Sequence, residues 1–326
     1  LGQEEYGLYA LIGSVSAYFS VLDLGLGNAI VRYTARNRAI GNKTSEKKLN
    51  GLLLLLYSII GLVSLIVGII IFKNINNIFE NSLSVMEIEK AKVMVIIITI
   101  NFALSFPLSI FGSIIQAYEK FVMLKGLEIL RTLLIPVLTL PILFLGYGSV
   151  SMVVITTVIN LAVLSFNFYY CIKFLDVNFY IGKIDFSLLK EIIGYSFFVF
   201  LGIIVDQIYW NTDQFILGII AGTVPVAIYA IAMQFKTIYM RFSTAISSLF
   251  LPKASIMVAS QASNNVLTNN LIRYGRLQYI ILSYILSGFV LFGHYFIILW
   301  AGKAYESAYY IALIVMVPLT FPLIQN

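Results

Sequence analysis

The chain has 326 residues, of which 60% are hydrophobic and only 11% carry a charge. Because a soluble domain has about 25% charged residues, this composition excludes a soluble enzyme, a disordered protein and a disulfide scaffold, and it indicates a membrane protein. The formal net charge of +6 therefore bears first on orientation in the membrane, and we expect no nucleic-acid partner.

Runs of about 20 apolar residues are long enough to cross the hydrocarbon core as helices. The sequence contains nine such runs, without the alternating pattern of barrel strands. A Gly-Tyr-Gly-Ser turn at 146–149 divides the longest uncharged stretch into two of them. In chain order, the predicted helices are Tyr6–Arg32, Leu49–Phe72, Val93–Tyr118, Phe121–Leu145, Val150–Ile172, Ile192–Gly222, Val224–Leu251, Leu277–Leu299 and Ser307 to the end. We therefore predict an all-α integral membrane protein, a polytopic helix bundle.

Basic residues are concentrated in alternate loops. Fourteen Lys and Arg residues lie in the loops after the first, third, fifth and seventh helices, and four lie in the loops between. Basic loops stay on the cytoplasmic side, so this asymmetry predicts the orientation of the chain. The basic run 32–48 could also bind anionic lipid headgroups, but the topology rule is sufficient to account for it and is the interpretation that we favour.

An internal repeat relates the two halves of the chain. Residues 1–10 are similar to 221–230, and Leu-Ser-Phe-Pro-Leu at 104–108 is similar to Leu-Thr-Phe-Pro-Leu at 319–323. The nearly constant offset superposes cytoplasmic loops on cytoplasmic loops, so the repeat is parallel, as in some transporters. We predict two six-helix lobes: an N-terminal lobe at 1–175, a cytoplasmic linker at 176–191 and a C-terminal lobe at 192–326. On this prediction the chain is a fragment of a protein with twelve or fourteen helices. It lacks the first helix of one lobe and about two helices of the other.

Several ionisable residues fall inside the predicted helices, where each costs about 2.5–3.5 kcal/mol to insert and must face the bundle interior or a wet cavity. Asp206 and Asp213 are seven residues apart and share one helix face. Asp23 continues a polar stripe with Ser16 and Ser20 on the first helix. The residues predicted to line a transport cavity are Asp23, Asp206, Gln207, Asp213, Lys236 and Arg241.

The roles expected of these residues follow from their chemistry. The Arg241 guanidinium suits an anionic headgroup, because it can bind phosphate oxygens with two parallel hydrogen bonds. Asp23 and Asp206 could titrate and carry coupling protons. The alternative for Asp213 and Lys236 is a structural ion pair between helices.

Other polar residues favour structural roles. Glu128 and Arg131 are three residues apart on one helix, and we expect them to pair with each other near the cytoplasmic end. His294 is expected to be an interfacial anchor. With one His and one Cys (Cys171), the sequence offers no plausible metal-ligand set and no disulfide. It also contains no nucleotide-binding motif, so we predict neither a metal nor another cofactor.

The sequence resembles a known transporter family in three places. Leu-Gly-Gln-Glu-Glu-Tyr-Gly-Leu-Tyr at 1–9 and Leu-Asp-Leu-Gly-Leu-Gly-Asn-Ala-Ile-Val-Arg-Tyr at 22–33 resemble the second-helix pattern of the polysaccharide transporter family, the Wzx-type oligosaccharide flippase branch of the MOP superfamily. Asp-Gln-Phe-Ile-Leu-Gly at 213–218 resembles the start of that family's second half. The resemblance implies a flippase with two six-helix lobes and a cationic central cavity, which would suit Lys236 and Arg241.

This resemblance also implies a substrate and a location. The substrate would be an undecaprenyl-pyrophosphate-linked oligosaccharide, moved by alternating access across the bacterial plasma (inner) membrane, with a proton or sodium as a coupling ion. The expected partners are therefore the lipid-linked oligosaccharide, the coupling ion and membrane lipids. We expect a multi-pass protein that is not an enzyme.

Three alternatives remain open at this point. A multidrug or cation antiporter of the same superfamily would share the lobes but favour an acidic cavity. A lipid II flippase is not separable by charge. A polytopic polysaccharide polymerase or lipid-sugar glycosyltransferase is disfavoured, because the largest predicted outer loop, 73–92, contains neither His nor paired Asp.

Overall fold

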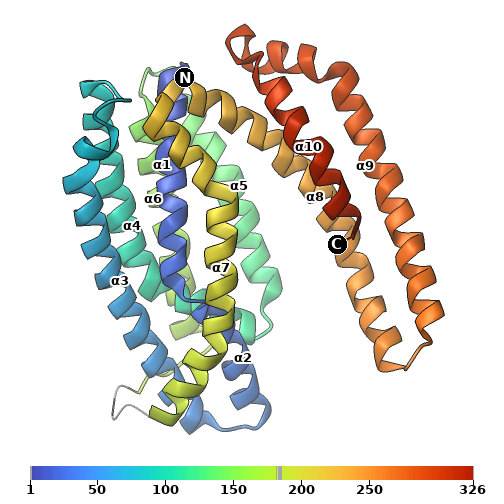
Figure 1. Cartoon of the computed structure of the whole chain (residues 1–326). Helices are drawn as coiled ribbons and strands as arrows, with labels where there is room; N and C mark the ends of the chain where they lie inside the picture. Colours follow the sequence, from blue (N-terminus) through green and yellow to red (C-terminus); the bar gives the residue numbers. More distant parts are fainter. Residues whose placement is uncertain (1, 181, 183–185, 326) are drawn as a thin grey trace. The chain divides into compact units, whose positions relative to one another are not determined.

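The computed structural model describes residues 2–180, 182 and 186–325 (Figure 1). Within these residues every regular element is a helix, and eight helical segments are long and apolar enough to cross a membrane. The prediction of an all-α polytopic membrane protein is therefore confirmed. The helices are α1 (Gln3–Phe19), α2 (Leu26–Ala39), α3 (Lys43–Phe79), α4 (Val85–Ala117), α5 (Phe121–Phe144), α6 (Ser149–Lys173), α7 (Phe186–Ala221), α8 (Thr223–Ala259), α9 (Asn264–Ala301) and α10 (Ala308–Gln325), with short 3-10 helices η1 (Ser20–Asp23) and η2 (Lys303–Tyr305).

Helix ends differ from the predicted ones where side chains cap them. Asn42 accepts a hydrogen bond from the Ser45 amide, so α3 begins at Lys43, six residues before the predicted start. Ser84 and Glu87 form a capping box that starts α4. The predicted outer loop 73–92 is consequently reduced to residues 80–84.

The first predicted span, Tyr6–Arg32, is interrupted. Leu24 and Gly25 both adopt left-handed backbone conformations, with φ of 53° and 71°, which end η1 and turn the chain into α2. At Gly25 a Cβ atom would lie 2.7 Å from Cβ of Val199 on α7. Glycine is therefore required there both by its φ and by the close approach of α7.

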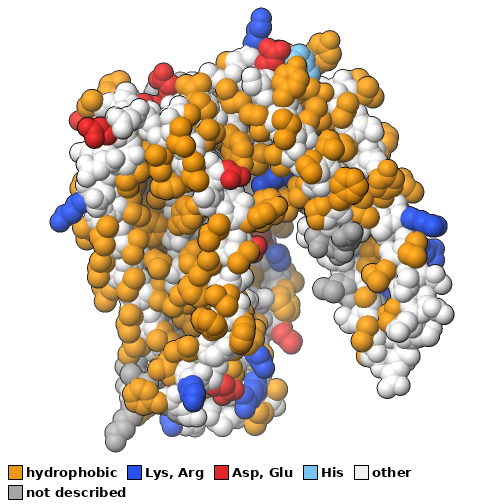
Figure 2. Space-filling view, in the orientation of Figure 1, with side chains coloured by type: hydrophobic (Ala, Val, Ile, Leu, Met, Phe, Trp, Pro, Cys, Tyr) orange, Lys and Arg blue, Asp and Glu red, His pale blue; other side chains and the backbone are white. Residues whose placement is uncertain are grey.

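The chain divides into two compact units, Leu1–Thr223 and Val224–Asn326. In the first unit α4 packs along α3 and α6, and small residues permit close contact. A Cβ atom at Gly68 would lie 2.0 Å from Oγ1 of Thr99, and one at Gly61 would lie 2.6 Å from the Ala103 carbonyl oxygen. Hydrophobic side chains cover much of the face seen in Figure 2, as expected of helices that contact lipid.

Helix α7 belongs to the first unit, although the predicted lobe boundary at 176–191 assigned it to the second. It packs against α1, α2 and α3, and Gly218 lies so close to Leu11 that a Cβ atom there would be 2.3 Å from a leucine methyl carbon. The division of this structure therefore falls after α7, at Thr223. Part of the predicted linker lies outside the described residues, and the arrangement as two six-helix lobes stays a prediction.

The second unit consists of α8, α9, η2 and α10, joined by buried polar contacts. The Tyr239 hydroxyl is 2.7 Å from the Thr320 hydroxyl, and Gln278 donates to Ser247 at 2.8 Å. Ser243 donates to the Leu323 carbonyl oxygen at 2.9 Å. These bonds join the three helices of the unit.

Candidate functional site

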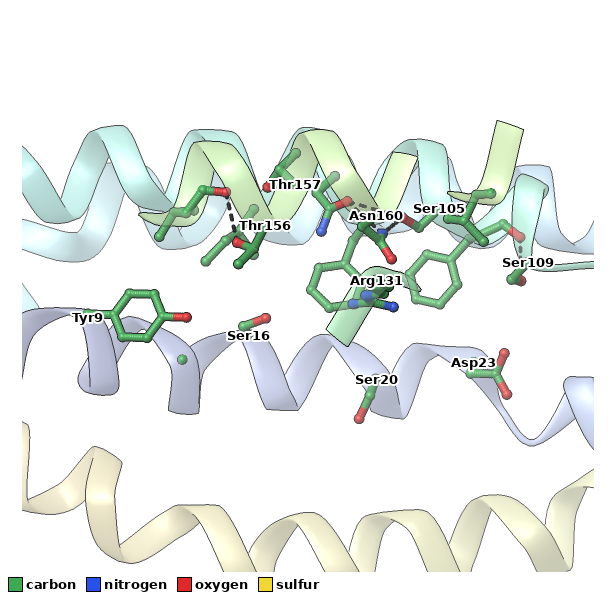
Figure 3. A pocket seen from close by; sticks show the side chains of 17 residues that line it. Tyr9, Ser16, Ser20, Asp23, Ser105, Ser109, Arg131, Thr156, Thr157 and Asn160 are labelled. Carbon is green, nitrogen blue, oxygen red and sulfur yellow. Dashed lines mark hydrogen bonds between the residues drawn. The ribbon is translucent and has the colours of Figure 1, made fainter. Parts of the chain in front are cut away.

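A cavity of about 470 Å³ lies within the first unit, between α1 and η1 on one side and α4, α5 and α6 on the other (Figure 3). Its polar lining is rich in hydroxyl and amide groups, which can both donate and accept hydrogen bonds. The polar residues that line it are Tyr9, Ser16, Ser20, Asp23, Asn101, Ser105, Ser109, Arg131, Thr156, Thr157 and Asn160, and the others are Gly13, Ile98, Phe102, Phe106, Val153 and Leu164.

Asn160 anchors the wall that α4 and α6 form. Its Nδ2 donates to Oδ1 of Asn101 at 3.0 Å and to the Ser105 hydroxyl at 2.9 Å, and Ser105 donates to Asn101 at 3.2 Å. All three side chains are half-buried. The network holds amide and hydroxyl groups in fixed positions at the cavity surface, as Figure 3 shows.

Arg131 supplies the positive charge of the cavity. Figure 3 shows its guanidinium between α1 and the α4–α6 wall. The sequence predicted a pair between Glu128 and Arg131, but Glu128 pairs instead with Lys125, at 2.6 Å. Among the described residues, Arg131 takes part in no ion pair. The guanidinium is therefore available to an anionic group in the cavity.

Asp23 lies at the break in the first span and is held by neighbouring donors. The Tyr57 hydroxyl donates to its Oδ1 at 2.7 Å, and the amides of Gly25 and Gly27 hydrogen-bond to the same carboxyl group. These amides belong to the start of α2, where the helix dipole favours a negative charge. Asp23 therefore holds the η1–α2 turn as well as lining the cavity.

The other five residues predicted for the transport cavity do not line this one. Asp206 and Asp213 are exposed on α7, and Gln207 accepts a hydrogen bond from Asn211 of the same helix at 2.8 Å. In the second unit, Lys236 is 7% exposed, whereas Arg241 is exposed. The structure thus places only Asp23 in the cavity, and a shared site for all six stays a prediction.

Several lining residues were missed by the sequence analysis although a signal was present. Asn101 and Ser105 are four residues apart on α4, and Thr156 and Asn160 are four apart on α6. This is the spacing of one helix face. Polar pairs of this kind on apolar helices point to a bundle interior, and a search for them would have found this wall.

His294, predicted to be an interfacial anchor, has a specific partner. Its Nε2 is 2.9 Å from Oε1 of Glu306, and its ring makes an edge contact with Tyr309.

In the part of the chain that the structure describes, no group of three or more His, Cys, Asp and Glu side chains could hold a metal ion.

The fold is shared with solved transporters of the MOP superfamily. A multidrug resistance MATE family transporter in its inward-facing conformation is 16% identical, with a TM-score of 0.70, over 99% of this chain and 78% of that one. An outward-facing structure of such a transporter is 20% identical, with a TM-score of 0.58, over 99% and 73%. A MOP superfamily transporter from Pyrococcus furiosus, described as having a binding pocket of reverse polarity, is 17% identical, with a TM-score of 0.60, over 98% and 74%.

Comparison with family models gives a match to the polysaccharide biosynthesis protein family over residues 1–255. A comparison with curated protein sequences gives no match. The family match covers the whole first unit and most of α8, and together with the shared fold it confirms the resemblance read from the sequence. The chain therefore belongs to the polysaccharide biosynthesis protein family, as a multi-pass membrane protein with the fold of MOP superfamily transporters.

Proposed function

We propose that this protein is a transporter that moves a lipid-linked oligosaccharide, of the undecaprenyl-pyrophosphate type, across the bacterial plasma membrane. The observation that carries the proposal is the cavity between α1, α4, α5 and α6. Its wall combines hydroxyl and amide groups with the Arg131 guanidinium, which forms no ion pair within the described residues. Its volume of about 470 Å³ lies within the range of small-molecule sites, about 300–1,000 Å³.

The lining suits a sugar that carries a phosphate. Sugar hydroxyl groups need neighbours that both donate and accept hydrogen bonds, and Ser, Thr and Asn side chains do both. Arg131 would bind a phosphate group, because the planar guanidinium offers parallel donors to two oxygens. Phe102 and Phe106 in the same wall offer apolar contact for the faces of sugar rings.

A multidrug antiporter is the second candidate, because the solved structures of similar fold include multidrug resistance transporters. A cationic drug favours an acidic cavity. Among the described residues that line this cavity, Asp23 is the acidic one, and Tyr57 and the amides of Gly25 and Gly27 already hydrogen-bond to it. The guanidinium of Arg131 would repel a cation. The lining thus favours an anionic, hydroxylated substrate.

The roles of the remaining predicted residues belong to the same proposal. Lys236 and Arg241 would add positive charge for the substrate phosphates, and Asp206, Gln207 and Asp213 would line the path. Asp23 and Asp206 are the candidates to carry a coupling proton, with sodium as the alternative ion. Transport of this kind requires no catalytic residue, so we propose a protein that is not an enzyme.

The test is transport of a fluorescent undecaprenyl-pyrophosphate oligosaccharide in proteoliposomes. Replacing Arg131 with Ala removes a charge-assisted contact worth about 1.5–3 kcal/mol, so transport should fall about 10- to 100-fold. Transport by Arg131→Lys should be intermediate between the wild type and Arg131→Ala, because lysine keeps the charge but lacks the planar guanidinium group. Lys73→Ala is the matched control, since Lys73 is an exposed cation on α3 outside the cavity.

Two results would overturn the proposal. One is transport by Arg131→Ala at the rate of the wild type, measured at equal amounts of inserted protein. The other is proton-coupled uptake of a cationic dye with no transport of the lipid-linked sugar, which would support the antiporter.

A further inference from the structure

A second cavity, of about 490 Å³, lies at the basic end of the first unit. It is bounded by the α2–α3 turn, the first turns of α3, the end of α4 and the segment 175–178. Several Lys and Arg side chains gather at this lower end of the unit in Figure 2. The lining residues are Arg38, Gly41, Lys43, Glu46, Lys47, Asn50, Tyr118, Leu175, Asp176, Val177 and Asn178.

The segment that follows α6 is fixed to α3 and forms one wall of this basic pocket. The Tyr180 amide donates to the Lys47 carbonyl oxygen at 3.0 Å, and the Val177 amide donates to the Cys171 carbonyl oxygen at 3.2 Å. Val177 is buried in the hydrophobic core. A Cβ atom at Gly51 would lie 2.0 Å from the Tyr180 carbonyl oxygen, so glycine permits this close contact. The pocket is thus a built part of the fold.

Arg38 is held in place at the rim of the pocket. Its guanidinium lies 3.7 Å from the centre of the Tyr118 ring and donates to the Ala117 carbonyl oxygen at 3.1 Å. The guanidinium has five N–H donors, so most of them remain for a ligand. Because stacking already fixes the side chain, little conformational entropy is lost when it binds an anion.

Two lysines on the first turns of α3 add to this positive charge. Lys43 and Lys47 are exposed, and neither forms an ion pair with any described residue. They lie at the amino-terminal end of the helix, where the dipole also favours an anion. A smaller adjoining cavity, of about 290 Å³, is lined by the same two lysines and by Lys48.

Two acidic side chains, Glu46 and Asp176, offset part of this charge and leave the lining with one net positive charge. Glu46 is buried, and its Oε1 accepts a hydrogen bond from the Tyr118 hydroxyl at 2.6 Å. Burial and the adjacent Glu46 carboxylate raise the pKa of the Tyr118 hydroxyl above its usual range, so it remains a donor to Glu46. Asp176 is exposed.

Asn50 provides an independent indication of a ligand. It is 1% exposed, and its Oδ1 has no hydrogen-bond partner within the described residues. Its Nδ2 makes only a long contact, of 3.4 Å, with the Asn178 carbonyl oxygen. A buried acceptor without a donor costs about 1–3 kcal/mol. A ligand hydroxyl group in the pocket would satisfy it.

We propose that this basic pocket binds a phosphate ester that carries a hydroxyl group, supplied by the headgroup of an anionic glycerophospholipid such as phosphatidylglycerol. Arg38, Lys43 and Lys47 bind the phosphate, and Asn50 accepts the hydroxyl. Basic pockets between membrane helices on the cytoplasmic side are suited to lipid headgroups. The topology rule explains why positive charges lie at this end, but it explains neither the cavity nor the buried amide oxygen. The site is separate from the α1–α4–α6 cavity, so the proposal does not depend on the transported substrate.

The test is thermal unfolding of the purified, delipidated protein in a neutral detergent. Phosphatidylglycerol at about a hundredfold over its Kd should raise the Tm by ~5 °C or more, and phosphatidylcholine should not. The Lys43→Ala/Lys47→Ala variant should lose at least half of this rise. Lys120→Ala/Lys190→Ala is the matched control, because both lysines are exposed, carry the same charge and lie outside the pocket.

Two further measurements distinguish a lipid headgroup from a soluble phosphate ester, and recognition of the hydroxyl group from recognition of the phosphate. If soluble glycerol 3-phosphate raises the Tm as much as the lipid does, and Lys43→Ala/Lys47→Ala loses that rise, the site is supported and its ligand is a free phosphate ester. Phosphatidic acid lacks the glycerol hydroxyls, so wild type should prefer phosphatidylglycerol to it, and Asn50→Leu should abolish that preference. An equal rise in both double-lysine variants, or no rise with any of these phosphates, would overturn the proposal.

Discussion

The hydrogen bond between Tyr57 and Asp23 makes a quantitative prediction about the break in the first span. Tyr57 is 1% exposed, and its hydroxyl lies 2.7 Å from the Asp23 carboxyl oxygen. Tyr57→Phe keeps the ring in the core and removes the hydroxyl, with its bond to Asp23 and its interaction with Ser109. Bonds to charged groups contribute about 1.5–3 kcal/mol, and for a unit of this size each kcal/mol shifts the Tm by about 2–4 °C. We therefore expect the Tm to fall by about 3 °C or more.

Intrinsic-fluorescence unfolding in detergent measures this change, and Tyr33→Phe is its matched control. Tyr33 lies in the same hydrophobic core and is 5% exposed, but its hydroxyl donates to the Glu191 carbonyl oxygen at 3.4 Å. That distance exceeds the usual 2.5–3.0 Å for O–H donors, so the Tm of Tyr33→Phe should fall by about 1 °C or less. Equal losses in the two variants would refute the reasoning.

A double-mutant cycle with Asp23→Ala separates this bond from general packing. Residues in contact show coupling energies of about 0.5–3 kcal/mol, whereas distant residues behave additively. If the bond stabilises the η1–α2 turn, Tyr57→Phe should lower the free energy of unfolding much less in the Asp23→Ala background than in the wild type. Additive losses would show that the two residues act independently.

Two further predictions concern transport through the cavity. Gly13 lines it, and a Cβ atom there would meet no atom within 4 Å. Gly13→Phe should therefore fill part of the cavity and lower lipid-linked sugar transport without lowering the Tm. As the control, Gly126→Phe, at an equally open position of α5 outside the lining, should leave transport unchanged. Lys125→Ala should lower transport by releasing Glu128 to pair with Arg131, and Glu128→Gln in the same variant should restore it. Loss of transport that Glu128→Gln does not reverse would contradict the second prediction.

Much of the fold was predictable because lipid imposes a simple length rule on apolar helices. All nine predicted helices are present, the ninth as the shorter α10. The ends were predicted less well, because they depend on capping side chains. The Ser-x-x-Glu capping box at 84–87 can be read from the sequence, but a rule based on hydropathy alone places the start of α4 several residues too late.

The break at Leu24 and Gly25 could not be predicted from local sequence. Glycine at 25 indicates conformational freedom, but Leu24 is a residue for which a left-handed conformation costs about 1–2 kcal/mol. The surrounding tertiary structure must offset that cost. The donors to Asp23 and the approach of α7 at Val199 contribute to it. The amides of Gly25 and Gly27 are local donors, but the Tyr57–Asp23 bond and the approach of Val199 to Gly25 join positions more than 30 residues apart, which no helical spacing reveals.

The position of Arg131 shows why helix spacing predicts possible partners and leaves the actual one open. Lys125, Glu128 and Arg131 follow each other at intervals of three, and each step turns the side chain by about 60° around a helix with 3.6 residues per turn. Glu128 can therefore pair in either direction. The pair with Lys125 leaves both side chains exposed, whereas Arg131 lines the cavity, so a pair with Arg131 would draw the carboxylate toward the cavity. Pairing with Lys125 thus gives the lower desolvation cost, and it leaves the guanidinium, one step further around the helix, to the cavity.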